Sequence, residues 1–190
     1  MKNKIAMIDL DGTLVNTKDV NYNAYKSVLL PYGIDLDYNY FCINCNGKKF
    51  TEFMPWLLKD FQFLDKSVMN KIHEEKKKIY SNFLYMARLN NFLVDIIKNL
   101  KDDYYIVLVT TASRTNSEEI LKYFRIMEYF DLLITQEDVI NEKPDPEGYM
   151  KALHFYNIKK ENAVIFEDSD VGILAAKESG IKYFVVNGYN

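Results

Sequence analysis

The chain has 190 residues, of which 48% are hydrophobic and 27% are charged, as is usual for a globular protein. This length accommodates one domain with an insertion or two small domains. A net charge of −3 argues against the basic surface that nucleic acids and anionic membranes attract. No apolar run approaches the ~20 residues of a membrane helix, and no signal-peptide pattern opens the chain, so we expect a cytoplasmic protein.

The N-terminal stretch from Ile5 to Leu14 combines a short apolar run with two acids. The run predicts a buried strand that ends in Asp9 and Asp11, followed by Gly12. Because side chains alternate along an extended strand, both carboxylates should emerge on one side, on the order of 6–7 Å apart. The glycine permits a sharp turn or the close approach of a ligand. Taken alone, such a pair also fits a helix cap or a solvated turn.

The middle of the chain has helical periodicity, and we predict no strand from Thr17 to Arg88. The predicted helices are one that ends near Pro31, an aromatic segment over 50–61 that Pro55 either starts or kinks, and one from about 66 into the eighties. The lysine run 76–78 is expected on a solvated helix face.

The two cysteines, Cys42 and Cys45, form a Cys-x-x-Cys pair. A zinc site needs four ligands, and neither His73 nor His154 lies near the pair in the sequence. A redox dithiol usually opens a helix after a strand, which is not the pattern here. We therefore expect reduced, partly buried cysteines and assign them no chemical role.

From about residue 90 strands alternate with helices, which indicates a parallel sheet with both faces covered. The predicted strands are 104–109, 131–134, 163–166 and 182–186, and the predicted helices are 91–100, 116–125, 146–156 and one that ends at Gly180. Thr115 and Glu118 form a candidate capping box, and Asp145 a candidate N-cap before Pro146. The sequence thus predicts an α/β core domain over residues 1–15 and 89–190, with an all-helical insert over 16–88.

Polar side chains follow the predicted strands at the edge where parallel sheets bind ligands. Asp9 and Asp11 follow the first strand, and Thr110 the second. The others are Lys143, Glu167 and Asp168. Each has an ordinary structural explanation as a cap or a surface residue. Together, four carboxylates and one lysine leave an excess of negative charge that a divalent cation would neutralise. Because the acidic ligands offer only oxygen, Mg²⁺ is favoured over zinc.

Four motifs resemble those of the haloacid dehalogenase-like hydrolase superfamily, in order and spacing. They are Asp9-x-Asp11-Gly12-Thr13-Leu14, Thr110 after an apolar strand, Lys143-Pro144-Asp145-Pro146, and Phe166-Glu167-Asp168-Ser169-x-x-Gly172-Ile173-x-Ala175-Ala176. The resemblance covers nearly the whole chain. It implies a Rossmann-like parallel sheet in the order 5-4-1-2-3, with a helical cap inserted after strand 1, as in the subgroup of phosphoglycolate phosphatases and β-phosphoglucomutases.

The resemblance also implies roles for the core residues. Asp9 would be the nucleophile that forms an aspartyl-phosphate, and Asp11 the acid and base that serves the leaving oxygen and then the attacking water. Thr110, Lys143 and the backbone around Thr111 would hold the phosphoryl oxygens.

The implied Mg²⁺ would bind the Asp9 carboxylate, the Asp11 carbonyl and Asp168, with Glu167 in a direct or water-mediated supporting role. Substrate selection would fall mainly to the cap. The candidate substrate contacts are Lys48, Lys49 and Arg114, together with Phe50, Phe53 and Trp56, although helically spaced aromatics more often form the core of their own domain.

Three alternatives stand beside a phosphatase. A receiver domain has related acids around Mg²⁺, but lacks the D-x-D-G-T unit and a long helical insert. A β-phosphoglucomutase-type mutase usually carries histidine where Asn21 aligns, and arginine shortly after the cap glycine, where this chain has Lys48, Lys49 and Phe50. An inactive scaffold would not need every motif side chain.

The chain also departs from the family pattern at the cap hinge. An acidic contact is absent there, since Asn16 replaces the usual aspartate.

The sequence therefore predicts a Mg²⁺-dependent phosphatase for a small phosphorylated metabolite. Asp11 argues against a dehalogenase, because dehalogenases lack the second acid of the first motif. We expect a monomer or a weak dimer, with no nucleic-acid or membrane partner.

Overall fold

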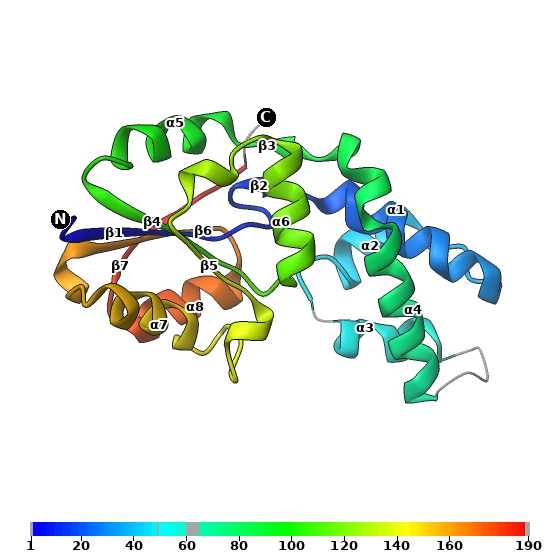
Figure 1. Ribbon diagram of the computed structural model, residues 1–190. Helices are drawn as coiled ribbons and strands as arrows, with labels where there is room; N and C mark the ends of the chain where they lie inside the picture. Colours follow the sequence, from blue (N-terminus) through cyan, green and yellow to red (C-terminus); the bar gives the residue numbers. More distant parts are fainter. Residues whose placement is uncertain (1, 49, 60–64, 189–190) are drawn as a thin grey trace. The chain divides into compact units, whose positions relative to one another are not determined.

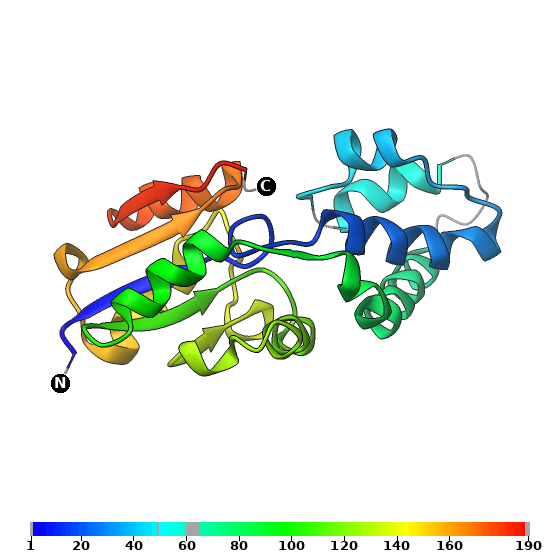
Figure 2. The same ribbon diagram turned by 90° about the horizontal axis from the view of Figure 1, so that it is seen from above.

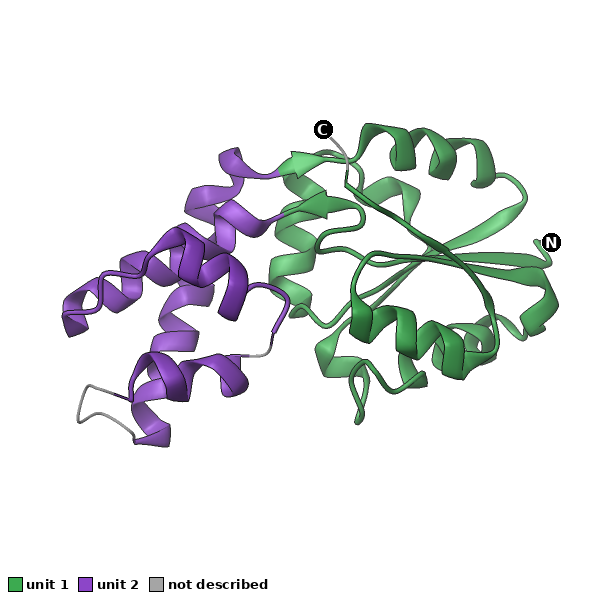
Figure 3. Cartoon of the chain, turned by 180° about the vertical axis from the view of Figure 1, so that it is seen from behind, with its two compact units in different colours: residues 1–16, 88–190 green, residues 17–87 purple. Residues whose placement is uncertain are grey.

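The structure is a computed structural model that describes residues 2–48, 50–59 and 65–188. The chain divides into unit 1, made of Met1–Asn16 and Arg88–Asn190, and unit 2, made of Thr17–Ala87 (Figure 3). Among the helices of the described residues, none combines the length and apolar character needed to cross a membrane.

Unit 1 is built on a parallel sheet of five strands. They are β1 (Lys4–Ile8), β4 (Tyr104–Val109), β5 (Leu132–Ile134), β6 (Ala163–Glu167) and β7 (Lys182–Val185). Their order is β5-β4-β1-β6-β7 (Figure 1). Numbered along the chain, this is the predicted order 5-4-1-2-3 read from the opposite edge. The α/β fold is therefore confirmed, with the first strand in the centre of the sheet.

Helices cover both faces of this sheet. The helices α5 (Asn91–Leu100) and α6 (Arg114–Tyr123) lie on one face, and α7 (Glu147–Tyr156) and α8 (Asp170–Ser179) on the other (Figures 1 and 2). Alternate residues of β1 face the α7 and α8 side, where Ile5 and Met7 join one buried apolar cluster. Short 3₁₀ turns complete the connections: η3 (Met127–Tyr129), η4 (Gln136–Asp138) and η5 (Lys160–Asn162).

Two helix starts in unit 1 differ from the prediction. Ser113, not Thr115, is the N-cap of α6, since its side chain accepts a hydrogen bond from the backbone N–H of Asn116. The predicted capping box is therefore wrong, because serine is an equally good cap and lies two residues earlier. The helix α7 begins one residue after its predicted start, although Asp145 still accepts from the backbone N–H of Glu147 at 2.9 Å.

A second, two-stranded sheet joins the ends of the unit 1 segments. Its strands β2 (Val15–Asn16) and β3 (Arg88–Leu89) pair antiparallel, with Val15 opposite Leu89. The prediction of no strand up to Arg88 is thus wrong at its last residue. A strand of two residues is too short to produce an alternating pattern in the sequence.

Over its described residues, 17–48, 50–59 and 65–87, unit 2 contains helices and no strand. Its elements are α1 (Lys18–Leu29), η1 (Leu30–Tyr32), α2 (Tyr38–Asn44), α3 (Phe50–Leu57), α4 (Lys66–Ile79) and η2 (Tyr80–Met86). Helix α3 contains Pro55. One apolar cluster forms the core of the unit, and Phe53 and Cys45 are buried in it, with Phe50 and Cys42 packed against it. Both cysteines are free thiols. Of the predicted aromatic contacts, Trp56 is 67% exposed.

The lysine run of α4 is not uniformly solvated, and this corrects the prediction. Lys78 is exposed, but Lys76 is buried. Because a helix turns about 100° per residue, consecutive side chains cannot share one face. Ile72, Lys76 and Tyr80 recur every four residues and all three are buried.

Candidate active site

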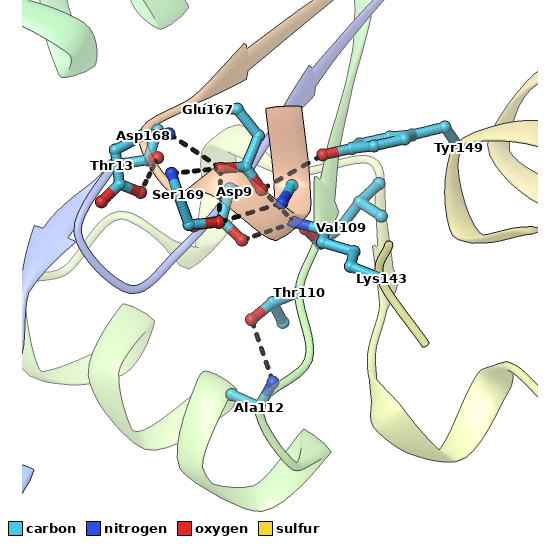
Figure 4. Close-up of polar contacts among 11 residues, drawn as sticks. Asp9, Thr13, Val109, Thr110, Ala112, Lys143, Tyr149, Glu167, Asp168 and Ser169 are labelled. Atoms are coloured by element: carbon cyan, nitrogen blue, oxygen red, sulfur yellow. Dashed lines mark hydrogen bonds and ion pairs between the residues drawn. The ribbon is translucent and has the colours of Figure 1, made fainter. Parts of the chain in front are cut away.

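The predicted chemical residues of unit 1 gather where the central strands end. Asp9 directly follows β1, and its backbone N–H donates to the carbonyl of Phe166 on the neighbouring strand β6 at 3.1 Å. Glu167 is the last residue of β6 and Asp168 follows it. Lys143 reaches the same place from the loop before α7 (Figure 4). The sheet therefore brings together side chains that are far apart in the sequence, such as Asp9 and Lys143, which are separated by 134 residues.

Lys143 is the centre of this cluster. Its ammonium group donates to Asp9 Oδ1 at 2.6 Å, to Glu167 Oε1 at 2.6 Å and to the carbonyl of Val109 at 2.9 Å (Figure 4). A lysine has three N–H donors, so these partners use all of them. The lysine side chain is 7% exposed and that of Asp9 10%. The arrangement fixes one oxygen of Asp9 in a dry, charged environment.

Glu167 is fully buried and accepts hydrogen bonds at both carboxylate oxygens. Oε1 accepts from Lys143 and from the hydroxyl of Tyr149 at 3.3 Å. Oε2 accepts from the backbone N–H groups of Asp168 and Ser169 at 2.8 and 2.9 Å, and from the Ser169 hydroxyl at 3.1 Å. A side chain at Gly172 would collide with this carboxylate. Glu167 thus fixes the turn that carries Asp168.

Asp168 is held by the turn that follows β1. Thr13 is buried, and its hydroxyl donates to Asp168 Oδ1 at 2.7 Å. Gly12 has φ +95°, and a Cβ atom there would overlap the Asp168 carboxylate. The glycine allows the expected turn, and it also lets the Asp168 carboxylate lie close to the backbone. The sequence motif thereby orients an acid that lies far along the chain.

Burial and mutual repulsion shift the pKa values of these groups. Burial raises the pKa of Asp9 well above its usual value, with Glu167 and Asp168 adding to the rise and Lys143 opposing it. Burial also raises the pKa of Asp168 to about 6, while the hydrogen bond from Thr13 lowers it. Burial lowers the pKa of Lys143, but Asp9, Tyr149 and Glu167 outweigh this effect and keep the lysine charged. Burial is therefore the main cause of both acid shifts, and the neighbouring carboxylates add to it.

The acids fit a divalent cation. Asp9, Glu167 and Asp168 each offer a carboxylate oxygen, and these oxygens lie within 4.8 Å of one another. Oxygen donors are those that Mg²⁺ prefers. The hydrogen bonds described above use Oδ1 of each aspartate but both oxygens of Glu167. The two aspartates are therefore the better suited to coordinate an ion directly, with Glu167 as support.

Asp11 and Thr110 lie in the loops beside this cluster. The strand β1 ends at Ile8, so the predicted extended geometry does not reach Asp11, which instead forms a bridge with Val15 in a turn. Its charge still helps to raise the pKa of Asp168. Thr110 follows β4, and its hydroxyl accepts from the backbone N–H of Ala112 at 3.1 Å. The hydroxyl hydrogen remains to donate to an anion.

The other predicted substrate contacts have varied surroundings. Thr111 is exposed in the loop after β4, and Lys48 is exposed in unit 2. Lys49 lies outside the described residues. The guanidinium group of Arg114 donates to Asp138 at 2.6 Å and to the carbonyl of Leu133 at 3.3 Å. Arg114 therefore joins the start of α6 to the β5 side of unit 1, a structural role that the sequence did not predict.

Three residues of the site were not predicted to take part in it. Thr13 and Ser169 stand inside the quoted motifs, directly beside residues that were assigned roles. Tyr149 was expected only as part of a helix. Its spacing from Lys143 carries no recognisable signal, because its contact depends on how α7 packs against the sheet.

Known proteins resemble the chain over nearly its whole length. The family model described as haloacid dehalogenase-like hydrolase matches residues 6–186. The phosphorylated carbohydrates phosphatase of Thermotoga maritima is 30% identical over 192 residues, which cover 97% of this chain and 86% of that protein. The pyrophosphatase PpaX of Halalkalibacterium halodurans is 28% identical over 191 residues, which cover 100% and 85% of the two chains. The crystal structure of CbbY from Rhodobacter sphaeroides in complex with phosphate has a TM-score of 0.84 and 25% identity, and the match covers 100% of this chain and 88% of that one.

Proposed function

We propose that this chain is a Mg²⁺-dependent phosphatase of small phosphate monoesters. The chain belongs to the haloacid dehalogenase-like hydrolases and acts on phosphate esters. The observation that carries the proposal is the contact of Lys143 with Asp9 at 2.6 Å, beside two further acids. A buried carboxylate that is oriented by an ammonium group is suited to attack phosphorus. We further propose a cytoplasmic location.

The proposed reaction has two steps. An oxygen of Asp9 forms a bond to phosphorus while the bond from phosphorus to the leaving oxygen breaks, and Asp11 gives its proton to that oxygen. Water then bonds to phosphorus, the aspartyl-phosphate bond breaks, and Asp11 takes the proton of the water. Phosphate leaves and Asp9 is regenerated. Lys143 holds Asp9 in place, and the hydroxyl of Thr110 is available to the phosphoryl oxygens.

The residues that would hold Mg²⁺ are Asp9, Asp168 and the carbonyl of Asp11. When bound, the ion supplies positive charge that screens the attacking carboxylate from the phosphate and stabilises the charge that develops on it. Thr13 orients Asp168 for this role through its hydrogen bond at 2.7 Å. Glu167 supports the site indirectly: it fixes the turn that carries Asp168, and it shares Lys143 with Asp9.

We assign unit 2, Thr17–Ala87, the role of a cap that excludes water and selects the substrate. Lys48 and Lys49 remain candidate contacts for an anionic substrate there. The printed name of the Thermotoga maritima relative makes phosphorylated carbohydrates the first substrates to try. Arg114 is no longer a favoured contact, because Asp138 and Leu133 engage it.

A mutase is the weaker alternative. The mutase subgroup usually carries histidine at the position of Asn21. Here the Oδ1 atom of Asn21 accepts from Lys76 at 2.6 Å and its Nδ2 donates to the Thr17 carbonyl at 3.2 Å. An amide does not exchange protons as an imidazole does. An isomerisation assay with glucose 1-phosphate and a bisphosphate primer separates the two activities, and a phosphatase should release phosphate without forming an isomer.

The proposal is tested by measuring phosphate release from sugar phosphates, other monoesters and pyrophosphate, with Mg²⁺ and with EDTA. We expect turnover of a subset only with Mg²⁺. Asp9→Asn should lower turnover at least about a thousandfold. Asp95→Asn is the matched control, since this acid on α5 is 69% exposed and pairs only loosely with Lys98 at 3.3 Å. Retained turnover in Asp9→Asn would show that Asp9 is not the nucleophile. Full turnover in EDTA would show that the reaction does not require a metal ion.

A further inference from the structure

Tyr149 lies behind the acid cluster, on the first turn of α7. Its side chain is fully buried. Its hydroxyl is 3.3 Å from Glu167 Oε1 (Figure 4), and the ring centroid is 5.3 Å from the Lys143 ammonium nitrogen. The residue thus contacts both partners of a buried ion pair without reaching Asp9.

The hydroxyl completes the set of donors around Glu167. Oε2 has three donors from the turn 168–169. Oε1 has two, Lys143 and Tyr149. Without the hydroxyl, Oε1 would depend on Lys143 alone, and the lysine is shared with Asp9 at the same distance of 2.6 Å. A neutral donor therefore reduces the pull of Glu167 on the lysine.

Packing alone does not require the hydroxyl. Phenylalanine has nearly the same volume and would fill the apolar cluster that Tyr149 joins with Ala152 and Leu153. A buried hydroxyl is costly unless it has a partner, and here that partner is a carboxylate oxygen at 3.3 Å.

We infer that Tyr149 is a positioning residue for the proposed reaction. Its hydroxyl holds Glu167 in place. Through Glu167 it orients Lys143 toward Asp9 and fixes the turn that carries Asp168. The inference rests on the proposed function for its kinetic consequence. Its structural part, the hold on the acids that would bind a cation, stands separately.

The test is Tyr149→Phe, with Tyr156→Phe as the matched control. Tyr156 lies two turns later on α7 and stacks on Tyr105 with centroids 3.9 Å apart, away from the acid cluster. We expect Tyr149→Phe to lower kcat about tenfold with KM changed less than about twofold, a typical loss for a residue that supports a catalytic group. Tyr156→Phe should leave both unchanged. Turnover is divided by the folded fraction from near-UV circular dichroism, and a loss that disappears on this correction overturns the inference.

A double-mutant cycle with Glu167→Gln shows whether Tyr149 acts through Glu167. If it does, Tyr149→Phe has little further effect in the Glu167→Gln background. An equal tenfold loss in both backgrounds overturns the inference, as does unchanged kcat in the single variant.

The same cycle is measured on Mn²⁺ affinity of the substrate-free protein, by electron paramagnetic resonance. This readout keeps the two proposals apart. If the wild-type protein hydrolyses no phosphate ester, the proposed function fails, while a Tyr149→Phe loss of about tenfold in Mn²⁺ affinity still supports the positioning role. If the wild-type protein is active and neither kcat nor Mn²⁺ affinity responds to Tyr149→Phe, the positioning role alone fails.

Discussion

Two buried lysines, one in each unit, differ in what surrounds their charge. Lys143 in unit 1 is 8% exposed and Lys76 in unit 2 is 6% exposed. Lys143 donates to two carboxylates and a carbonyl. Lys76 donates to the amide oxygen of Asn21 at 2.6 Å, and its nitrogen lies 4.3 Å from the ring centroid of Tyr80 and 5.2 Å from that of Tyr25.

The surroundings of Lys143 are suited to chemistry, whereas those of Lys76 are suited to packing. Lys143 is the cation that Asp9 and Glu167 share, so its removal would leave two buried carboxylates with their mutual repulsion uncompensated. Amide dipoles and aromatic faces around Lys76 offset burial with weaker attraction. The charged cluster can therefore hold a reacting acid in place, whereas the aromatic cluster joins α1 to α4 and η2. Each prediction below changes one side of this comparison.

The largest effect is expected for Lys143→Met. Methionine has a similar length but leaves Asp9 and Glu167 buried without their shared cation. Breaking a buried ion pair costs about 3–5 kcal/mol, and turnover should be lost with it. Urea unfolding in EDTA measures the stability, and phosphate release measures the turnover.

The control for Lys143→Met is Lys151→Met. Lys151 lies on α7 and its side chain is 44% exposed in a pair with Glu147, so the change should cost less than about 1 kcal/mol. Equal stabilities of the two variants would show that the buried cluster is not held together by its charges.

The next largest effect concerns the orientation of Asp168 in the charged cluster. Thr13→Val keeps the shape of the side chain but removes the donor to Asp168 Oδ1. Affinity for Mg²⁺ should fall about 10- to 100-fold, as is typical when the partner of a metal ligand is lost. Calorimetric titration with Mg²⁺ measures it. Thr13→Ser restores the hydroxyl and should restore most of the affinity; if serine binds as weakly as valine, the hydrogen bond is not what orients Asp168.

On the other side of the comparison, Lys76→Met should cost about 1–3 kcal/mol of stability, because it leaves the buried oxygen of Asn21 without its donor. The loss should be smaller than that of Lys143→Met, which leaves Asp9 and Glu167 buried without their shared cation. Hydrogen exchange of α1 and α4 measures it. The neighbouring Lys78 is exposed, and Lys78→Met should change the stability by less than about 0.5 kcal/mol. A larger loss of stability for Lys78→Met than for Lys76→Met would contradict the burial of Lys76 and the exposure of Lys78.

These two lysines also show what the sequence could predict. Lys143 stands in a motif beside a proline and between predicted elements, so its place near Asp9 followed from the rule that loops after parallel strands meet at one edge. The same rule located Thr110, Glu167 and Asp168. Strand positions were predictable because buried parallel strands appear as apolar runs, whereas the strand order came from the resemblance to a known family.

Side-chain contacts within the folded units were harder to predict. Lys76 looked solvated in a run of lysines, although its spacing from Ile72 and Tyr80 was a signal for burial. Tyr149 and Arg114 depend on how a helix packs against the sheet, which no local pattern encodes. Two-residue strands such as Arg88–Leu89 are below the length at which periodicity can be read.

The smallest predicted effect concerns His73, which shares the surroundings of Lys76. Its ring stacks on Phe50 with centroids 3.8 Å apart, and its Nδ1 lies 3.0 Å from the Tyr25 hydroxyl. Burial, together with the smaller effects of the charges of Lys77 and Lys76, lowers the pKa of His73 from 6.5 to about 4. The folded protein therefore resists a proton that the unfolded chain accepts.

The sign of the pH effect follows from this difference. Between pH 6.5 and 4 the unfolded state binds more protons at His73 than the folded state does, so stability falls as the pH falls through that range. We expect a loss of about 1 kcal/mol between pH 7 and 5, less than the full shift implies because solvent screens a half-buried ring. Urea unfolding at both values measures it. His73→Gln should flatten the dependence, while His154→Gln, at an exposed position, should not. Lys76→Met should also reduce the slope, because it removes one of the positive charges that oppose protonation of His73. If instead the slope is unchanged in Lys76→Met, the two side chains do not share one electrostatic environment, and the contrast with the charged cluster around Lys143 loses its basis in unit 2.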